Sequence, residues 1–276
     1  MITSHKLTMS AYEHSTYADF VTNYITPINT NYGITIDNLG VCSDDVKNIY
    51  GFSFGTVGKP MIYIQSSIHG DEWETAFYTI TFVEMIINPS LAPYPLQKIF
   101  KYLKYNYSFY YIPVVNPWGF ENQTRENFNM VDCNRNFGTW TEPETIIVRD
   151  KVQELKPLAY VDNQAMSRTS RHSVGGGVFK TRTLIDNIIK NMNFLLDVYV
   201  DPYPIDPYEA APDRGRGWIS TQLSNYGTNT IAILLECGWS QEHTAYLQEK
   251  GDFGLNANLS ALLHLDNFWK NRTLTI

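Results

Sequence analysis

The chain has 276 residues, of which 43% are hydrophobic and 14% aromatic, so it is long enough to bury a large core. Its net charge of −7 and its pI near 5.4 argue against a nucleic-acid surface, because phosphate binding needs a clustered basic footprint. We therefore expect small molecules, peptides or other proteins as partners, and no nucleic acid.

The N-terminal sequence and the cysteines indicate the cellular compartment that we expect. The N-terminus MITSHKLTMSAYEHS lacks a basic start followed by an apolar core, and no apolar run approaches the ~20 residues of a membrane span. We expect a protein without a membrane span that is cytoplasmic or released without a signal peptide. The three cysteines, Cys42, Cys133 and Cys237, have no paired spacing, which favours buried thiols in a reducing compartment.

Hydrophobic periodicity predicts alternating strands and helices. Helices are expected over residues 12–28, 71–87, 142–155 (with Thr141 as N-cap) and 256–269, and strands over 46–57, 61–64, 108–115, 158–162 and 230–235. We expect the first two strands to pair as a hairpin, and residues 116–140 to form a long functional loop. The pattern indicates an α/β fold in a single domain over 1–276, with a central sheet that is mostly parallel and with 1–45 as an N-terminal helical extension.

The most informative stretch is IYIQSSIHGDEWE, residues 62–74. His69 and Glu72 stand three residues apart where a strand gives way to a helix, so their side chains face the same way. An imidazole nitrogen and a carboxylate oxygen are a ligand pair that zinc accepts. The pair is common by chance, and a glutamate at a helix start is also favoured by the helix dipole alone.

Other strand ends carry polar residues as well. The strand over 108–115 is followed by Arg125 and by the run Asp132-Cys-Asn-Arg-Asn-Phe, and the strand over 158–162 ends in Asp162-Asn163-Gln164. The apolar strand over 230–235 ends in Glu236, a carboxylate that is costly to bury without a partner. Sites in α/β sheets gather at the carboxyl ends of strands, so these residues are expected to meet.

Taken in order, SIHGDEWE, NPWGFENQTREN, DCNRNF, WTEPET and LLECG resemble the zinc carboxypeptidases of the carboxypeptidase A type, and the compact spacing resembles the shorter bacterial members. The resemblance implies a mixed sheet of about eight strands between helices. It also implies one zinc ion and a peptide substrate with a free C-terminal carboxylate.

Carried over by position, the resemblance makes His69 and Glu72 zinc ligands and Glu236 the general base. Arg125 matches the arginine that polarises the scissile carbonyl. Asn134 and Arg135 match the pair that binds the terminal carboxylate, for which a planar guanidinium is well suited.

The chain departs from the family pattern at the third ligand. Gln164 stands where an Asp-x-His pattern would place a histidine, and an amide oxygen is a poor zinc donor. The chain is then a natural degenerate, or has had its histidine replaced, or completes the metal site with another residue such as His172.

Substrate preference is less defined by the sequence. Tyr203, Tyr208 and Tyr226 are candidates for the family's mobile tyrosine, and the pocket for the terminal side chain is expected over residues 214–225. Arg214 and Arg216 there suggest an acidic group, as in a γ-glutamyl or cell-wall peptide, although they could equally be solvated charges.

Three functions therefore remain open. The first is a zinc carboxypeptidase whose activity is impaired by Gln164. The second is a degenerate module that binds carboxylate ends or serves as a structural scaffold. The third is an amidohydrolase of N-acyl amino acids.

Overall fold

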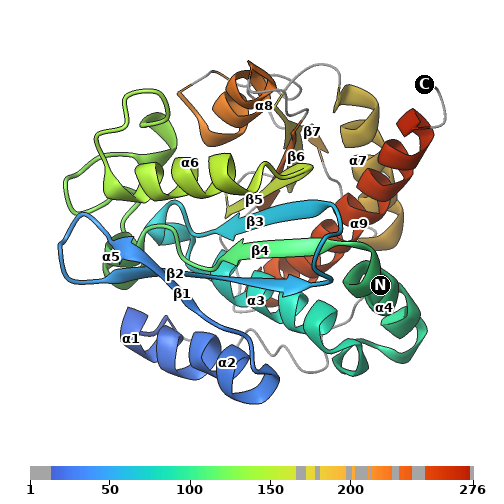
Figure 1. The fold of residues 1–276 in the computed structure, drawn as a ribbon, viewed down its shortest axis with the longest axis horizontal. Helices are drawn as coiled ribbons and strands as arrows, with labels where there is room; N and C mark the ends of the chain where they lie inside the picture. Colours follow the sequence, from blue (N-terminus) through green and yellow to red (C-terminus); the bar gives the residue numbers. More distant parts are fainter. Residues whose placement is uncertain are drawn as a thin grey trace.

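The computed structural model describes residues 14–165, 172–177, 181–196, 201–202, 211, 213–225, 230–237 and 246–273. Within these residues the strands form one eight-stranded sheet in the order β1-β2-β4-β3-β5-β8-β6-β7 (Figure 1). The strands are β1 (Asp37–Val41), β2 (Asn48–Gly55), β3 (Met61–Ser66), β4 (Ser108–Ile112), β5 (Ala159–Ala165), β6 (Ser173–Gly176), β7 (Asp201–Pro202) and β8 (Ile231–Cys237).

The centre of the sheet is parallel, as predicted. β3 pairs in parallel with β4 and β5, and β5 pairs in parallel with β8. The outer pairs β1–β2, β2–β4 and β6–β8 are antiparallel. The carboxyl ends of β3, β4, β5 and β8 therefore meet at one edge of the sheet.

The predicted hairpin between the strands at 46–57 and 61–64 is wrong. β2 pairs with β1 and β4, and β4 lies between β2 and β3. The chain leaves β2 at Gly55, whose φ of +83° suits glycine, and the Thr56 N–H donates to Tyr107 O at 2.9 Å. This hydrogen bond holds the short connection between β2 and β3 against Tyr107, the residue before β4. Strand β4 lies beside β2, in the place predicted for β3.

Helices cover both faces of the sheet (Figure 1). They are α1 (Tyr17–Phe20), the π-helical turn η2 (Val21–Ile25), α2 (Thr26–Tyr32), α3 (Glu74–Ile87), α4 (Gln97–Asn106), α5 (Pro117–Asn122), α6 (Pro143–Leu155), α7 (Arg182–Leu196), α8 (Gly215–Asn225) and α9 (Tyr246–Thr273). Short 3-10 turns are η3 (Gly70–Glu72), η4 (Pro89–Leu91), η5 (Tyr94–Leu96) and η6 (Cys133–Arg135). No helix among the described residues is long and apolar enough to span a membrane.

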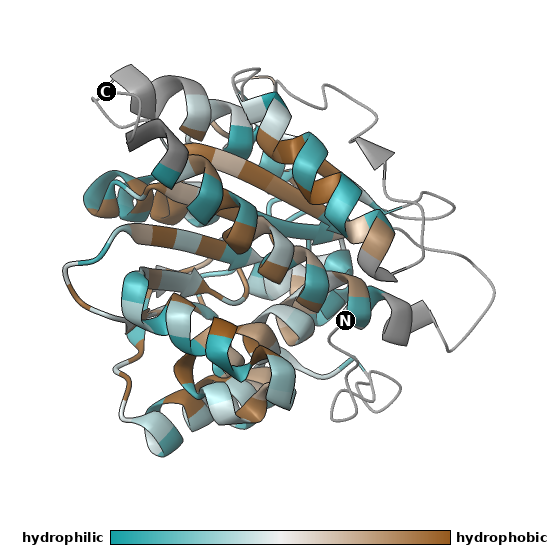
Figure 2. Cartoon of the chain, turned by 90° about the vertical axis from the view of Figure 1, so that its right-hand side faces the viewer, coloured by the Kyte–Doolittle hydropathy of each residue, from teal (hydrophilic) through white to brown (hydrophobic). Residues whose placement is uncertain are grey.

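The core lies in two layers, one on each face of the sheet. One layer joins the sheet to α1, α2, α3, α4, α7 and α9, and the other joins it to α6, α8 and the loop around η6. The interior strands are accordingly hydrophobic along most of their length, whereas hydrophilic residues recur along the helices (Figure 2). A sheet covered on both faces needs apolar side chains on both, which is why β3, β4 and β8 read as nearly continuous apolar runs.

Two other expectations need correction. The N-terminal helical part ends at Tyr32, short of residue 45, because residues 37–41 join the sheet as β1. Helix α6 takes Glu142 as its N-cap residue, not Thr141. The Thr141 hydroxyl instead accepts a hydrogen bond from Asn136 Nδ2 at 2.7 Å. All three cysteines are buried and free, as expected.

Candidate active site

His69 and Glu72 lie together directly after β3. The Nδ1 atom of His69 is 2.7 Å from Glu72 Oε1, and both residues are buried. The turn that carries them, η3, packs against α5 so closely that a Cβ on Gly70 would come within 1.8 Å of the Gly119 carbonyl carbon. Glycine between the two side chains is therefore a packing requirement, and it fixes the turn that brings them together.

Asp132 and Arg125 complete a charged group around His69. Asp132 Oδ1 is 3.1 Å from His69 Nε2, and Asp132 Oδ2 accepts from Arg125 Nε at 3.0 Å. Arg125 Nη1 lies 3.6 Å from Glu72 Oε1. The four side chains form a continuous network of two acids and two bases, and Arg125 is the most exposed of them at 38%.

The network controls the charge of its members. Burial opposes protonation of His69, but the charge of Glu72 and hydrogen bonds to Asp132 and Glu72 raise the pKa of His69 to about 10. Burial likewise opposes ionisation of Asp132, but its bond to His69 and the charges of His69 and Arg125 hold its pKa well below the usual range. Each ring nitrogen of His69 thus lies within hydrogen-bonding distance of a carboxylate, Nδ1 of Glu72 and Nε2 of Asp132.

Gln164 lies on β5 beside this network, but its side chain is engaged elsewhere. Its Nε2 donates to Asp162 Oδ2 at 2.6 Å, and its Oε1 accepts from Asn134 Nδ2 at 3.4 Å. The backbone N–H of the next residue, Ala165, donates to Glu72 Oε2 at 2.9 Å. The strand is therefore placed next to the predicted ligands, while Asp162 and Asn134 determine how the amide is turned.

Glu236 lies on the neighbouring strand, where it pairs in register with Gln164. It is 5% exposed, and its Oε2 atom is buried without a hydrogen-bond partner. Burial first, and then the charge of Glu72, raise the pKa of Glu236 to about 8. An orphaned buried carboxylate of this kind is typical of a functional site.

Asn134 and Arg135, the pair predicted to bind the terminal carboxylate (the carboxylate clamp), lie in different environments. Asn134 is buried, and its Oδ1 accepts from the Gly215 N–H at 3.0 Å, which ties η6 to the start of α8. Arg135 is exposed, and its Nη1 donates to Asn134 O at 2.9 Å. Since a guanidinium has five N–H donors, Arg135 keeps donors for a ligand.

The ring of His172 takes part in aromatic packing. Its ring stacks on Phe253 of α9, with ring centroids 4.2 Å apart and planes 3° from parallel. This packing makes it a poor substitute for the third ligand. The three candidate tyrosines, Tyr203, Tyr208 and Tyr226, lie outside the described residues.

His69 and Glu72 suit zinc as a pair, because their N and O atoms converge and Asp132 lies at the other ring nitrogen, an arrangement typical of zinc-binding histidines. Among the described residues, no group of three or more His, Cys, Asp or Glu side chains is placed to hold a metal ion. The orphaned Glu236 oxygen beside them also suits a site that receives a cation or a reacting group. Gln164 offers the weakest donor of the set, an amide oxygen.

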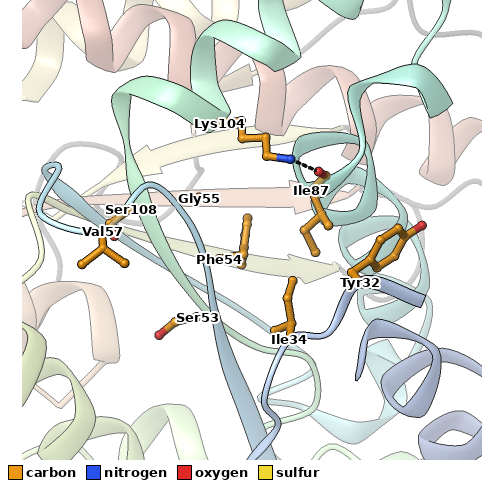
Figure 3. A pocket seen from close by; sticks show the side chains of 9 residues that line it. All are labelled: Tyr32, Ile34, Ser53, Phe54, Gly55, Val57, Ile87, Lys104 and Ser108. Atoms are coloured by element: carbon orange, nitrogen blue, oxygen red, sulfur yellow. Dashed lines mark hydrogen bonds between the residues drawn. The ribbon is translucent and has the colours of Figure 1, made fainter. Parts of the chain in front are cut away.

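A separate hollow of about 370 Å³ lies between β2, α2 and α4 (Figure 3). It is lined by residues such as Phe54, Ile34 and Lys104, and the Lys104 Nζ donates to Ile87 O at 2.6 Å. None of the predicted site residues lines it. The chemistry of the chain is therefore concentrated at the carboxyl edge of the central strands.

Solved structures described as carboxypeptidases share this fold. The chain resembles the carboxypeptidase A of Helicoverpa armigera (14% identity, TM-score 0.72, covering 94% of this chain and 74% of that one). It also resembles a metallo-carboxypeptidase from Burkholderia cenocepacia (15%, 0.69, 90% and 68%) and the bovine thrombin-activatable fibrinolysis inhibitor (16%, 0.72, 92% and 98%). At these identities the likeness shows the fold.

The sequence itself shows the family. A family model described as zinc carboxypeptidase matches residues 44–181, half of the chain. The chain belongs to the zinc carboxypeptidase family. No curated protein sequence matches it.

Sequence reasoning assigned no role to two residues that the structure brings into the site. Asp132 orients His69, and Asp162, buried and with its pKa raised to about 6 by burial, orients Gln164. Both stand in polar runs that were noticed as unusual. Their position in the sequence is a usable signal, because Asp132 lies two residues before Asn134 and Asp162 lies two residues before Gln164.

Proposed function

We propose that the chain is a zinc-dependent carboxypeptidase that hydrolyses the C-terminal amide bond of a peptide, with activity limited by Gln164. The observation that carries the proposal is the buried pair of His69 Nδ1 and Glu72 Oε1, 2.7 Å apart, with one oxygen of Glu236, Oε2, that has no hydrogen-bond partner among the described residues and lies at the same edge of the sheet. This combination has no evident structural use, because an orphaned buried carboxylate costs stability.

A zinc ion would be held by His69, Glu72 and Gln164, and would supply Lewis acidity that polarises a carbonyl and makes water more acidic. Glu236 would accept a proton from the attacking water at Oε2 and deliver it to the leaving amine. Burial, and then the charge of Glu72, raise the pKa of Glu236, which favours a carboxyl group that can hold a proton as well as release it.

The arginines would bind and orient the substrate. Arg125, which Asp132 holds from one side, would direct its remaining donors at the oxygen of the scissile carbonyl. Arg135, with Asn134, would bind the terminal carboxylate and so restrict hydrolysis to chain ends. The proposed substrates are peptides with a free C-terminus, including γ-glutamyl or cell-wall peptides.

A second function is favoured by the engaged amide of Gln164. If Asp162 and Asn134 hold that amide in place, the chain would bind carboxylate ends without turnover. Both functions use Asn134 and Arg135 to bind the carboxylate, and only hydrolysis requires a zinc ion.

Gln164→His separates them. Loss of one protein ligand should weaken a zinc site by more than the ~10- to 100-fold that a change around the ligands costs. We expect the histidine variant to bind zinc well over tenfold more tightly and to gain peptidase activity. The measurements are zinc titration of chelator-treated protein and hydrolysis of an N-acylated dipeptide.

Gln153→His is the matched control, because it adds the same side chain near the end of α6, before the start of β5, whereas position 164 lies near the other end of that strand. Equal zinc affinity and equal rates in the native chain and Gln164→His would contradict a ligand role for position 164. Tight zinc binding without turnover in both would favour the binding module.

A further inference from the structure

Arg214, which immediately precedes α8, has polar atoms that no described residue satisfies. Its Nε and Nη1 atoms are buried without a hydrogen-bond partner. The same is true of Ser173 Oγ on β6, Ser220 Oγ on α8 and Glu236 Oε2 on β8. These orphaned atoms come from elements that adjoin: β6 pairs with β8, and α8 packs on β8.

Arg214 is also held beside the proposed carboxylate clamp. The N–H of the next residue, Gly215, donates to Asn134 Oδ1 at 3.0 Å, and Arg135 follows Asn134 in the chain. A second bond, from the Phe137 N–H to Asp213 O at 3.2 Å, fixes the two segments on the other side. Arg135 and Arg214 therefore flank a single hydrogen bond between η6 and α8.

A guanidinium is always charged, and burying its donors without a partner is unfavourable. The protein offers Arg214 no carboxylate within the described residues, although it pairs Arg125 with Asp132 and Arg182 with Asp186. The missing partner is an anion with a planar, two-oxygen edge, which suits a fork of N–H donors. A carboxylate on the ligand has that shape and charge.

We propose that Arg214 binds the side-chain carboxylate of the terminal residue, so that the site selects peptides ending in glutamate or aspartate. The inference rests on the proposed function, since it requires Arg135 to bind the terminal α-carboxylate. An acidic terminal residue carries two carboxylates, and the two arginines on either side of the Asn134–Gly215 bond match them.

Arg216 has a different role. It is 3% exposed, and its Nη1 donates to the Gly176 carbonyl at 3.0 Å, so it joins α8 to β6. Selection of the acidic side chain is assigned to Arg214 alone.

The experiment is calorimetric titration of the full chain with four matched N-acylated peptides. Two end in glutamate or glutamine with a free carboxylate, and two are the corresponding C-terminal amides. Glutamine has the shape of glutamate without the charge. We expect the free-acid glutamate peptide to bind about 10- to 100-fold more tightly than the glutamine peptide, as for a hydrogen bond to a charged group.

The outcomes distinguish this inference from the proposed function. Equal affinity for the glutamate and glutamine peptides, with the acids still preferred to the amides, overturns the role of Arg214 and leaves the clamp. Indifference to both groups overturns the clamp, and the inference with it.

Variants test the residue directly. Arg214→Gln should lose the preference for glutamate while keeping the preference for a free C-terminus. Arg214→Lys keeps the charge and should retain part of the glutamate preference. Arg182→Gln on α7, whose side chain is 54% exposed, is the control and should bind like the native chain. A glutamate preference that survives Arg214→Gln would overturn the assignment.

Discussion

Protonation of His172 should make the stability of the fold depend on pH. Burial, and then the charge of Lys250, lower the pKa of His172 from 6.5 to about 4. The folded protein thus favours neutral imidazole, whereas the unfolded chain takes up a proton near pH 6.5. The unfolded state binds more protons between these values, so stability contributed by His172 is present above pH 6.5 and is lost as the pH falls toward 4.

The size of the effect follows from the two pKa values. A depression from 6.5 to about 4 corresponds to ~3 kcal/mol at most. The assay is urea unfolding of the native chain and of His172→Phe between pH 4.5 and 8. Phenylalanine keeps the stacking on Phe253 and removes the titration. Asp162, whose pKa is raised, contributes in the opposite sense but equally to both proteins, so it cancels in the difference.

We expect the native chain to lose stability relative to His172→Phe as the pH falls, by ~2–3 kcal/mol over this range. A difference that stays constant from pH 4.5 to 8 would refute the buried, neutral state of His172. It would also reopen a metal-binding role for that side chain.

Two further predictions concern buried charges. Lys250→Met should destabilise the fold by ~3–5 kcal/mol in urea unfolding, because it leaves the buried Glu74, 4% exposed and paired with Lys250, without its cation. The double variant Lys250→Met with Glu74→Leu should recover most of the lost stability. A double variant as unstable as Lys250→Met would contradict the pairing. Asp132→Asn should weaken zinc binding ~10- to 100-fold in competition with a chelator, because it removes the carboxylate that contacts His69 Nε2. Unchanged zinc affinity would show that Asp132 does not orient His69.

The buried strands could be predicted from the sequence because burial on both faces leaves a simple pattern. The runs that became β3, β4 and β8 are short and apolar along most of their length, which favours buried strands. β1 escaped prediction because Asp37-Asn-Leu-Gly-Val has little β propensity and is held by pairing with β2. The order of β2, β4 and β3 also escaped, since pairing between strands far apart in the chain leaves no local signal.

Candidate site residues could be named from the sequence more readily than their contacts. Residue types and spacing indicated His69, Glu72 and Glu236, because each is costly or unusual where it stands. The orientation of the Gln164 amide depends on Asp162 two residues earlier and on Asn134 thirty residues away. The donors of Arg214 are unsatisfied because no acceptor among the described residues lies within hydrogen-bonding distance of them. Neither can be read without the packed structure.

The amide of Gln164 links the two halves of the site. On one side, its strand supports Glu72 through the Ala165 N–H. On the other, its oxygen accepts from Asn134, whose own oxygen holds the start of α8 through Gly215. A histidine at this position could ligate a metal, but it could not accept from Asn134 with the same ring nitrogen. Glutamine at this position therefore joins the strand beside Glu72 to the loop that carries Arg135 and, through Asn134, to the segment that carries Arg214.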